Sequence, residues 1–204
     1  MLVAALTLNY SCSEPIEGPG NEQGGGEDNG GDDATYKAGD YYKKGMAEGI
    51  IAYVDESGEH GLLISLDETR AQWSTEHHML TVQGGEFSME DGAWNSEYIR
   101  QQENWKDKYP AFAWCHAKNA LNLSSWYLPA IYELALAHEN LEAINATLTE
   151  KGYEPIATGV SDQYWTSVEV GVTSAYAFSF NLGEIASYDL DKKNEHRVRA
   201  MRKF

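Results

Sequence analysis

Short apolar runs separated by turn residues predict a series of strands along the chain. GIIAYVD (residues 49–55) and LLISLD (residues 62–67) are rich in β-branched and apolar residues, and the turn sequence ESGEHG between them predicts a hairpin. In the last third, four further runs predict short antiparallel strands: YWTSVE (164–169), SAYAFSFNLG (174–183), EIASYDL (184–190) and HRVRAMRKF (196–204). In the last run Arg197 and Arg199 alternate with apolar residues, which is typical of a strand with one buried face.

Two segments between these strands have helical features. YPAFAWCHAKNAL (residues 109–121) places a proline in the first helical turn and spaces its apolar residues by three and four. Pro129 similarly predicts the first turn of a second helix, whose apolar stripe continues to a stop signal at residues 151–152. The bulky W-Y-L block directly before this proline predicts a short strand that enters the core. Residues 68–108 predict long loops, with at most one short helix near residues 97–103.

The order of these elements, strands followed by helices and then strands, predicts an α+β fold. We expect two helices, short antiparallel strands and long loops in one domain over residues 41–204, with the terminal strands able to meet. Before this domain, residues 13–40 are rich in glycine and acids and have almost nothing apolar to bury. This composition predicts a disordered acidic tether.

The first twelve residues resemble the end of a bacterial lipoprotein signal. An apolar run, MLVAALTLNYS, precedes Cys12, which would receive a lipid after cleavage. No Lys or Arg precedes this run, so Met1 would be an internal start, and Asn9 occupies the place where leucine is usual. The run is too short for the roughly 20 apolar residues that cross a bilayer. The alternative interpretation is a cysteine that occurs there by chance.

The formal charge of −17 excludes some classes of partner. Proteins that bind nucleic acid or dock on anionic membranes by charge need clustered Lys and Arg. Residues 13–40 contain eight acids and one base, so about −7 of the charge lies in the tether. A lipidated Cys12 would leave Cys115 without a partner, and we expect no intrachain disulfide.

Several motifs, taken in order, resemble one family of exported bacterial domains. They are YYKKGMAEGIIAYVDESGEHGLLISLDETRAQWS, YPAFAWC, SSWYLPAIYEL, YWTSVE and RVRAMRKF, over about residues 39–204. This set resembles the DUF1566 or Lcl C-terminal-like domain, with W-Y-L-P-A-x-x-E-L, Y-W-T-S-x-E and V-R-x-M-R as its sharpest marks. The resemblance implies a C-type-lectin-like fold, distantly similar to formylglycine-generating enzymes and found in surface lipoproteins, adhesins and pilus-tip proteins of Bacteroides-type bacteria. It implies no particular reaction.

The motif residues of this family have a structural interpretation here. They map to Trp126, Leu128, Pro129, Glu133, Leu134, Trp165, Ser167, Glu169, Val198 and Arg199. We expect the tryptophans and leucines to fill the core. Glu133 and Glu169 are expected to pair with Arg197, Arg199 or Arg202 and so to hold the long loops together. A role in ligand binding is the alternative.

No pattern in the sequence predicts a catalytic centre. Formylglycine-generating enzymes use a cysteine pair that holds copper, whereas this domain offers Cys115 alone, and a lone helical cysteine is expected to be a small buried hydrophobe. An enzyme of that class would need an accessible Cys115 beside a second metal ligand such as His116. The motifs of serine hydrolases, P-loops and dinucleotide-binding domains are absent. Acid pairs such as Asp55-Glu56 are expected to be solvated turn residues rather than glycosidase carboxylates.

Metal binding has little support in the sequence. The six histidines are scattered, no H-E-x-x-H occurs, and the adjacent His77 and His78 would point to opposite faces of a strand. E-P-I (154–156) and W-N-S (94–96) resemble the calcium-binding triplets of sugar-binding lectins, but each lacks its last ligand. DLDKKNE (189–195) lacks the glycine and terminal glutamate of an EF-hand loop. We therefore expect no metal cofactor and a calcium site that is at most weak.

Aromatic residues in the predicted loops are the remaining candidates for a binding site. Flat apolar rings beside amide groups are typical of surfaces that bind sugars or peptides. We expect ligand contacts from Trp94, Asn95, Tyr98, Trp105 and Tyr188. The alternative, which we favour for Trp73, is that these rings anchor the loops to the body of the domain.

Together these features predict a non-enzymatic outer-membrane lipoprotein, anchored through Cys12, that presents a ligand-binding domain at the cell surface or the periplasmic face. The expected ligand is a glycan, a host or bacterial surface protein, or a neighbouring pilin subunit. Two alternatives stay open. One is a divergent relative of formylglycine-generating enzymes that oxidises a partner protein, and the other is a purely structural role in pilus assembly.

Overall fold

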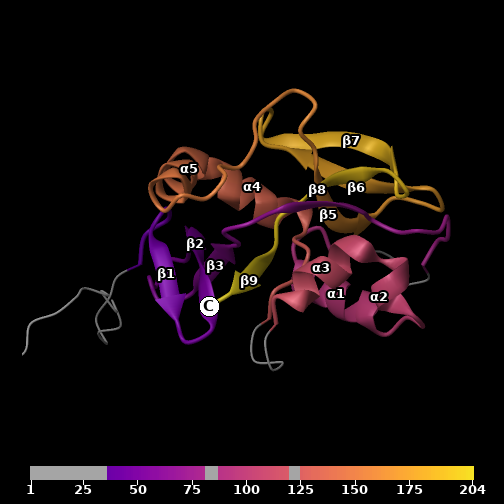
Figure 1. Ribbon diagram of the computed structural model, residues 1–204, viewed down its shortest axis with the longest axis horizontal. Coiled ribbons are helices and arrows are strands. Elements are labelled where there is room, and N and C mark those ends of the chain that lie inside the picture. Colours follow the sequence, from indigo (N-terminus) through magenta and orange to yellow (C-terminus); the bar gives the residue numbers. More distant parts are fainter. Residues whose placement is uncertain (1–35, 81–86, 120–124) are drawn as a thin grey trace, which may run out of the picture.

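Two β-sheets and five helices surround one hydrophobic core in the part of the chain that the computed structural model describes (Figure 1). The structure describes residues 36–80, 87–119 and 125–204. The predicted signal segment and most of the predicted tether lie outside these residues. The presence of both helices and sheets in one core confirms the α+β class.

The smaller sheet is antiparallel throughout, with the strand order β1-β2-β3-β9. Its strands are β1 (Tyr41–Lys44), β2 (Ala47–Val54), β3 (Gly61–Ile64) and β9 (Met201–Lys203). The β2–β3 pair confirms the predicted hairpin. The last strand of the chain lies beside β3, so the two ends of the domain meet in one sheet, as expected (Figure 1).

The larger sheet has the order β4-β8-β5-β6-β7. Its strands are β4 (Thr69–Gln72), β8 (Glu195–Val198), β5 (Tyr164–Glu169), β6 (Ser174–Ser179) and β7 (Glu184–Asp191). The strands predicted in the last third of the chain are therefore present. They are antiparallel except for β5 and β8, which pair in parallel, so the expectation of a purely antiparallel arrangement is wrong.

A two-stranded ribbon passes from one sheet to the other. It is continuous because β3 and β9 pair in the smaller sheet while β4 and β8, their chain neighbours, pair in the larger one. At the crossing, Ser65 N–H donates to Ala200 O over 2.9 Å, and Ala200 N–H donates to Ser65 Oγ over 3.0 Å. The guanidinium of Arg199 is buried there and donates to the carboxylate of Glu68 at 3.0 and 3.2 Å. The single strand expected over residues 196–204 is therefore two strands, because Arg199 turns inward.

The described residues form five helices instead of the two expected. They are α1 (Gly92–Arg100), α2 (Trp105–Lys108), α3 (Pro110–Ala117), α4 (Ile131–Glu139) and α5 (Leu141–Glu150). The predicted helix after Tyr109 is present as α3, with its proline at the first position. Within the described residues, no helix is long and apolar enough to cross a bilayer.

The second predicted helix is divided, and it begins later than expected. Pro129 lies before the N-cap residue Ala130 and not in the first turn. The break between α4 and α5 falls at Asn140, whose φ of −115° departs from helical backbone. Its side-chain amide donates to Leu136 O and to Ala52 O, both at 3.2 Å. The same amide therefore ends one helix and attaches this corner to β2.

The segment expected to be long loops contains β4, α1 and α2. The helix α1 begins where the Asp91 carboxylate accepts a hydrogen bond from Trp94 N–H at 3.0 Å, an N-cap that supplies one of the missing acceptors of the first turn. Asn104, with a φ of +54°, separates α1 from α2. The short helix expected near residues 97–103 overlaps the end of α1, which begins earlier, at Gly92. The helix α2 was not predicted, because its polar residues obscure the helical period.

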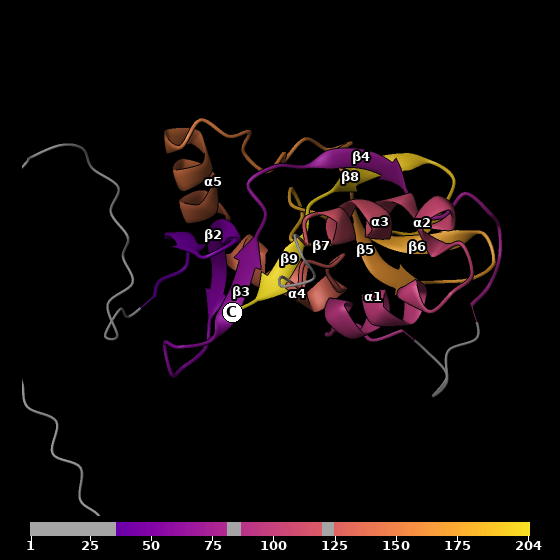
Figure 2. The ribbon, with the colours of Figure 1, turned by 60° about the horizontal axis from the view of Figure 1, so that its bottom comes forward.

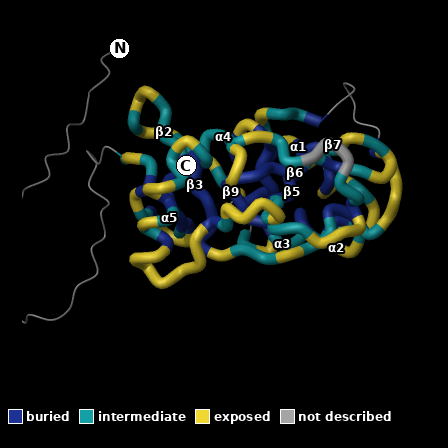
Figure 3. The backbone as a smooth tube through the Cα atoms, turned by 90° about the horizontal axis from the view of Figure 1, so that it is seen from above, coloured by how far each residue is buried: buried dark blue, intermediate teal, exposed yellow. Residues whose placement is uncertain are grey.

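The helices occupy two places around the sheets. α5 packs against β2 of the smaller sheet, while α4 contacts β2 and also β5 and β6 of the larger one (Figure 2). α1, α2 and α3 form a separate group against β4 and β5. The buried residues run continuously through the middle of the molecule from one sheet to the other (Figure 3).

Residues 36–40, which the sequence assigned to the tether, are part of the folded domain. The Tyr36 ring lies 5.5 Å from the ring of Tyr42 and 5.3 Å from that of Phe204. Gly39 N–H donates to Ile51 O over 2.7 Å. Through these contacts residues 36–40 pack against the smaller sheet, and the folded part of the chain begins no later than Tyr36.

Candidate functional site

The W-Y-L-P-A-x-x-E-L motif builds one wall of the candidate site, and Glu133 holds that wall together. Glu133 is 3% exposed. Its Oε1 accepts a hydrogen bond from the Tyr127 hydroxyl at 2.6 Å, and its Oε2 accepts from the backbone N–H groups of Ala130 at 2.8 Å and Gly92 at 3.1 Å. Burial raises the pKa of Glu133, and these three donors oppose that rise. None of them is an arginine, so the expected pairing with arginine is wrong.

One carboxylate thereby joins the N-termini of two helices. Ala130 is the N-cap of α4, and Gly92 is the first residue of α1. Negative charge is favourable at both positions because unpaired N–H groups and helix dipoles point toward it. Gly92 allows this close approach, since a Cβ there would lie 2.5 Å from Leu128 O and 2.7 Å from Glu133 Oε2. The helix α1 is therefore held directly against the motif.

Glu169, the acid of the Y-W-T-S-x-E motif, also has a partner that the sequence did not predict. Its Oε1 lies 2.5 Å from Nζ of Lys192, which is fully buried. The same ammonium group donates to His78 O over 2.9 Å, and Leu80 N–H donates to Glu169 Oε2 over 3.0 Å. The expected arginine partner is wrong, because Arg197 and Arg199 both face Glu68 at the sheet crossing.

The tryptophans of the W-Y-L-P-A-x-x-E-L and Y-W-T-S-x-E motifs lie inside the domain. Trp165 is fully buried, and its Nε1–H donates to Ala71 O over 2.9 Å. Trp126 is buried and lies close to β2, where a Cβ on Gly49 would lie 3.1 Å from its ring. Trp73 is also fully buried, as the loop-anchor interpretation predicts.

The residues predicted to contact a ligand occupy different environments. Trp94, 43% exposed, stacks on Tyr98 of the next turn of α1 with ring centroids 6.4 Å apart. Asn95 is fully buried: its amide donates to Ser88 O at 2.7 Å and to Ser167 Oγ at 2.8 Å, and its oxygen accepts from Ser88 N–H at 2.8 Å. All of its close partners are within the protein, so the prediction that Asn95 contacts a ligand is wrong.

The two remaining predicted contacts lie elsewhere. Trp105 of α2 is half-buried and packs edge-on against His116 of α3, with ring centroids 5.2 Å apart. The side chain of Tyr188 lies outside the described residues. The predicted set is therefore not one surface, although Trp105 reaches a residue that lines the pocket described next.

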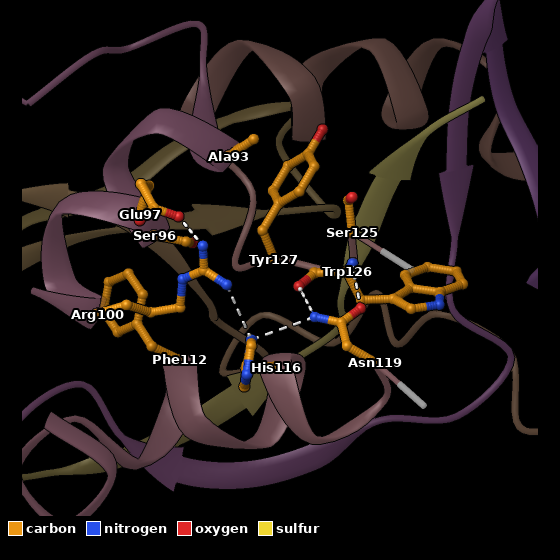
Figure 4. Close-up of a pocket in the computed structure, with 10 residues that line it drawn as sticks. All are labelled: Ala93, Ser96, Glu97, Arg100, Phe112, His116, Asn119, Ser125, Trp126 and Tyr127. Atoms are coloured by element: carbon orange, nitrogen blue, oxygen red, sulfur yellow. Dashed lines mark hydrogen bonds and ion pairs between the residues drawn. The ribbon is translucent and has the colours of Figure 1, made fainter. Parts of the chain in front are cut away.

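A pocket of about 320 Å³ opens between α1, α3 and the strand-like segment before Pro129 (Figure 4). Its lining consists of Ala93, Ser96, Glu97, Arg100, Phe112, His116, Asn119, Ser125, Trp126 and Tyr127. The four residues from α1 follow the spacing i, i+3, i+4 and i+7, which places them on one face of that helix. The two from α3 are four residues apart, so one face of each helix meets the pocket.

The polar groups at the back of the pocket have defined hydrogen-bond directions. The Oδ1 of Asn119 accepts from Trp126 N–H at 2.7 Å, so its Nδ2 is the donor to Trp126 O at 3.1 Å and to His116 Nδ1 at 3.3 Å. Arg100 also approaches His116 Nδ1, at 3.4 Å. Since both neighbours can only donate, Nδ1 is the acceptor and the ring proton lies on Nε2. Burial, with the charges of Arg100 and Lys106, lowers the pKa of His116 and keeps the ring neutral.

The mouth of the pocket carries an ion pair. Arg100 lies between Glu97, one helical turn away on α1, and His116 (Figure 4). The side chains of Arg100 and Glu97 are 38% and 51% exposed, respectively, so both are accessible to a ligand. Buried rings of Phe112 and Tyr127 form the apolar part of the lining. The arrangement provides donors, acceptors and apolar surface in one small concave site, which suits binding.

Cys115 faces away from solvent on the inner side of α3. It is fully buried, and burial raises the pKa of its thiol far above the usual value. The enzyme alternative required an accessible Cys115 beside His116, and the structure gives no such accessibility. In the parts of the chain that the structure describes, no group of three or more His, Cys, Asp or Glu residues is placed to hold a metal ion.

Comparisons with known proteins add a fold relationship. No protein-family model matches the sequence, and no curated protein matches it. A solved structure, that of a fimbrial protein from Bacteroides ovatus ATCC 8483, superposes with a TM-score of 0.52 and 21% sequence identity. The match covers 71% of this chain and 36% of that protein, so this chain spans about a third of its length. At this identity the match shows a shared fold.

Proposed function

We propose that this chain is a cell-envelope protein whose domain binds a ligand without catalysis, and that the pocket between α1 and α3 is the recognition site. The pocket carries the proposal, because it combines an accessible ion pair, oriented polar groups and aromatic walls in one concavity. The buried, protonated thiol of Cys115 supports binding over oxidative chemistry. The expected ligand is a glycan or a surface protein.

The proposed location in the cell envelope rests on the sequence and on the fold. A lipid on Cys12 and an acidic tether would hold the domain away from the membrane surface, as expected of a DUF1566-type domain with a C-type-lectin-like fold. The shared fold with a fimbrial protein supports an exported protein. Growth with a clickable palmitate analogue should label the wild-type chain in envelope fractions and not the Cys12→Ala variant, and equal labelling of both would contradict the anchor.

The binding role is tested with the full-length chain on an array of glycans and extracellular matrix proteins, once with calcium and once with a chelator. We expect binding that survives chelation, because Glu97 is the single carboxylate among the described lining residues and calcium needs a cluster of oxygen ligands. Arg100→Ala should weaken it about tenfold or more. Trp94→Ala tests the exposed ring pair on α1 as the competing site. Absence of binding to every member of both arrays would refute the recognition role.

A role as a fimbrial assembly subunit is the second candidate, and the fold shared with a fimbrial protein favours it. It predicts that cross-linking of the native envelope yields ladders of this chain with itself or with a pilin. The recognition role predicts no such ladders. Thiol labelling addresses the enzyme alternative, because reaction of Cys115 in the native protein would restore that possibility.

A further inference from the structure

We infer that the pocket between α1 and α3 binds a neutral sugar ring through adjacent hydroxyl groups, without a metal ion. The inference rests on the proposed function, because it takes the same pocket as the recognition site and names its ligand class.

The charge of the pocket favours a neutral ligand. Among the described lining residues, the formal charges are those of Glu97 and Arg100, which pair with each other. His116 adds no charge, because its Nδ1 accepts hydrogen bonds from two donor groups. An anionic ligand would compete with Glu97 for the guanidinium, and a cationic ligand would be repelled by Arg100. A ligand without charge loses neither interaction.

The ion pair at the mouth matches the hydroxyl groups of a sugar. Each hydroxyl donates one hydrogen bond and accepts others, so two neighbouring hydroxyls can donate to the Glu97 carboxylate and accept from the Arg100 guanidinium. A guanidinium carries five N–H donors, more than its contacts with Glu97 and His116 use. Hydrogen bonds to charged groups are stronger than those between neutral groups, which compensates for the desolvation of both partners. The exposed Ser125 adds a further hydroxyl at the rim.

The shape and the back wall of the pocket fit one ring. Its volume of about 320 Å³ lies at the small end of the range for ligand sites, which favours one sugar unit over a peptide segment. The buried rings of Phe112 and Tyr127 close the apolar floor of the pocket, and they offer the C–H groups of a sugar a small apolar contact. Asn119 and His116 hold Arg100 in position, so the donor side of the site is preformed.

The test is a titration of the full-length chain, in chelator, with the methyl glycosides of glucose, galactose, mannose and N-acetylglucosamine, and with methyl glucuronide as the acidic comparator. Saturation-transfer NMR gives the contact and isothermal titration the Kd. We expect at least one neutral glycoside to bind more tightly than the glucuronide. Glu97→Gln and Arg100→Ala should each weaken it about tenfold or more, the loss of one hydrogen bond to a charged group. Glu103→Gln, an exposed acid of the following turn outside the lining, is the matched control and should bind like wild type.

The possible results separate the inference from the proposed function. Preference for the glucuronide overturns the inference while the recognition role and its site stand. Binding of a neutral sugar that Glu97→Gln and Arg100→Ala leave unchanged overturns the inference and the choice of this pocket as the site, while a recognition role elsewhere on the domain stands. Absence of binding to every glycoside, with binding of a matrix protein on the array, likewise overturns only the inference. Circular dichroism and urea unfolding of each variant exclude loss of the fold as the cause.

Discussion

Replacement of Glu133 should loosen the whole site, because one carboxylate serves three buried donors on two segments, the stretch before α4 and the start of α1. In Glu133→Ala, the Tyr127 hydroxyl and the N–H groups of Ala130 and Gly92 lose their acceptor. A buried polar group without a partner costs about 1–3 kcal/mol, and water entering the space left by the side chain would recover part of this. We therefore expect a loss of about 3–5 kcal/mol, a large share of the 5–15 kcal/mol typical of a domain.

Glu133→Gln separates geometry from charge. The amide oxygen can still accept from Ala130 and Gly92, so only the contact with Tyr127 changes, and we expect a loss of about 1–2 kcal/mol. Tyr127→Phe, which removes the third donor, should cost a similar amount, and the two substitutions together should cost less than their sum because they break the same hydrogen bond.

Urea unfolding followed by tryptophan fluorescence measures these differences. For a chain of this size, each kcal/mol also corresponds to about 2–4 °C in the thermal midpoint. Glu133→Ala and Glu133→Gln with equal costs would refute the reasoning, because the effect would then come from charge alone. A cost below about 1 kcal/mol for Glu133→Ala would show that the carboxylate does not join the two helices.

Three further predictions follow from the same network and the two sheets. Gly92→Ala should destabilise the domain by about 1–3 kcal/mol through overlap with backbone, whereas Gly171→Ala, whose Cβ would lie 3.9 Å from its nearest neighbour, should change the free energy of unfolding by less than about 0.5 kcal/mol. Lys192→Met should cost about 3–5 kcal/mol because it leaves Glu169 buried without its cation, and Glu169→Gln in the same chain should restore most of the loss; equal costs for the single and double variants would contradict this pairing. For His196, burial lowers the pKa, so the native ring stays neutral while the unfolded ring takes up a proton below about pH 6.5. Its contribution is therefore complete above that pH and decreases as the pH falls toward the native pKa, so His196→Phe should flatten the stability profile measured between pH 7 and 5.

Local patterns in the sequence were sufficient for most of the strands. The hairpin of β2 and β3 follows from two apolar runs around a turn, and these are interactions between residues close in the chain. The helix α3 likewise follows from a proline followed by spaced apolar residues. Glu97 and Arg100 of α1 were not identified as site residues. A short helix was expected near residues 97–103, but its start at Gly92 was missed, so the face of α1 that lines the pocket could not be recognised.

The sequence by itself determined that this is an α+β chain with an acidic N-terminal tract and two motif glutamates that had to be paired somewhere inside. Only the tertiary structure decided the partners. Glu133 accepts a hydrogen bond from Gly92, 41 residues away, and Glu169 pairs with Lys192. Folding of the core brings these distant parts of the chain together. A buried carboxylate needs hydrogen-bond donors or a cation, and this requirement can be expected from the sequence alone. Which donors satisfy it depends on backbone N–H groups and side chains that become neighbours only when the two sheets and five helices pack together.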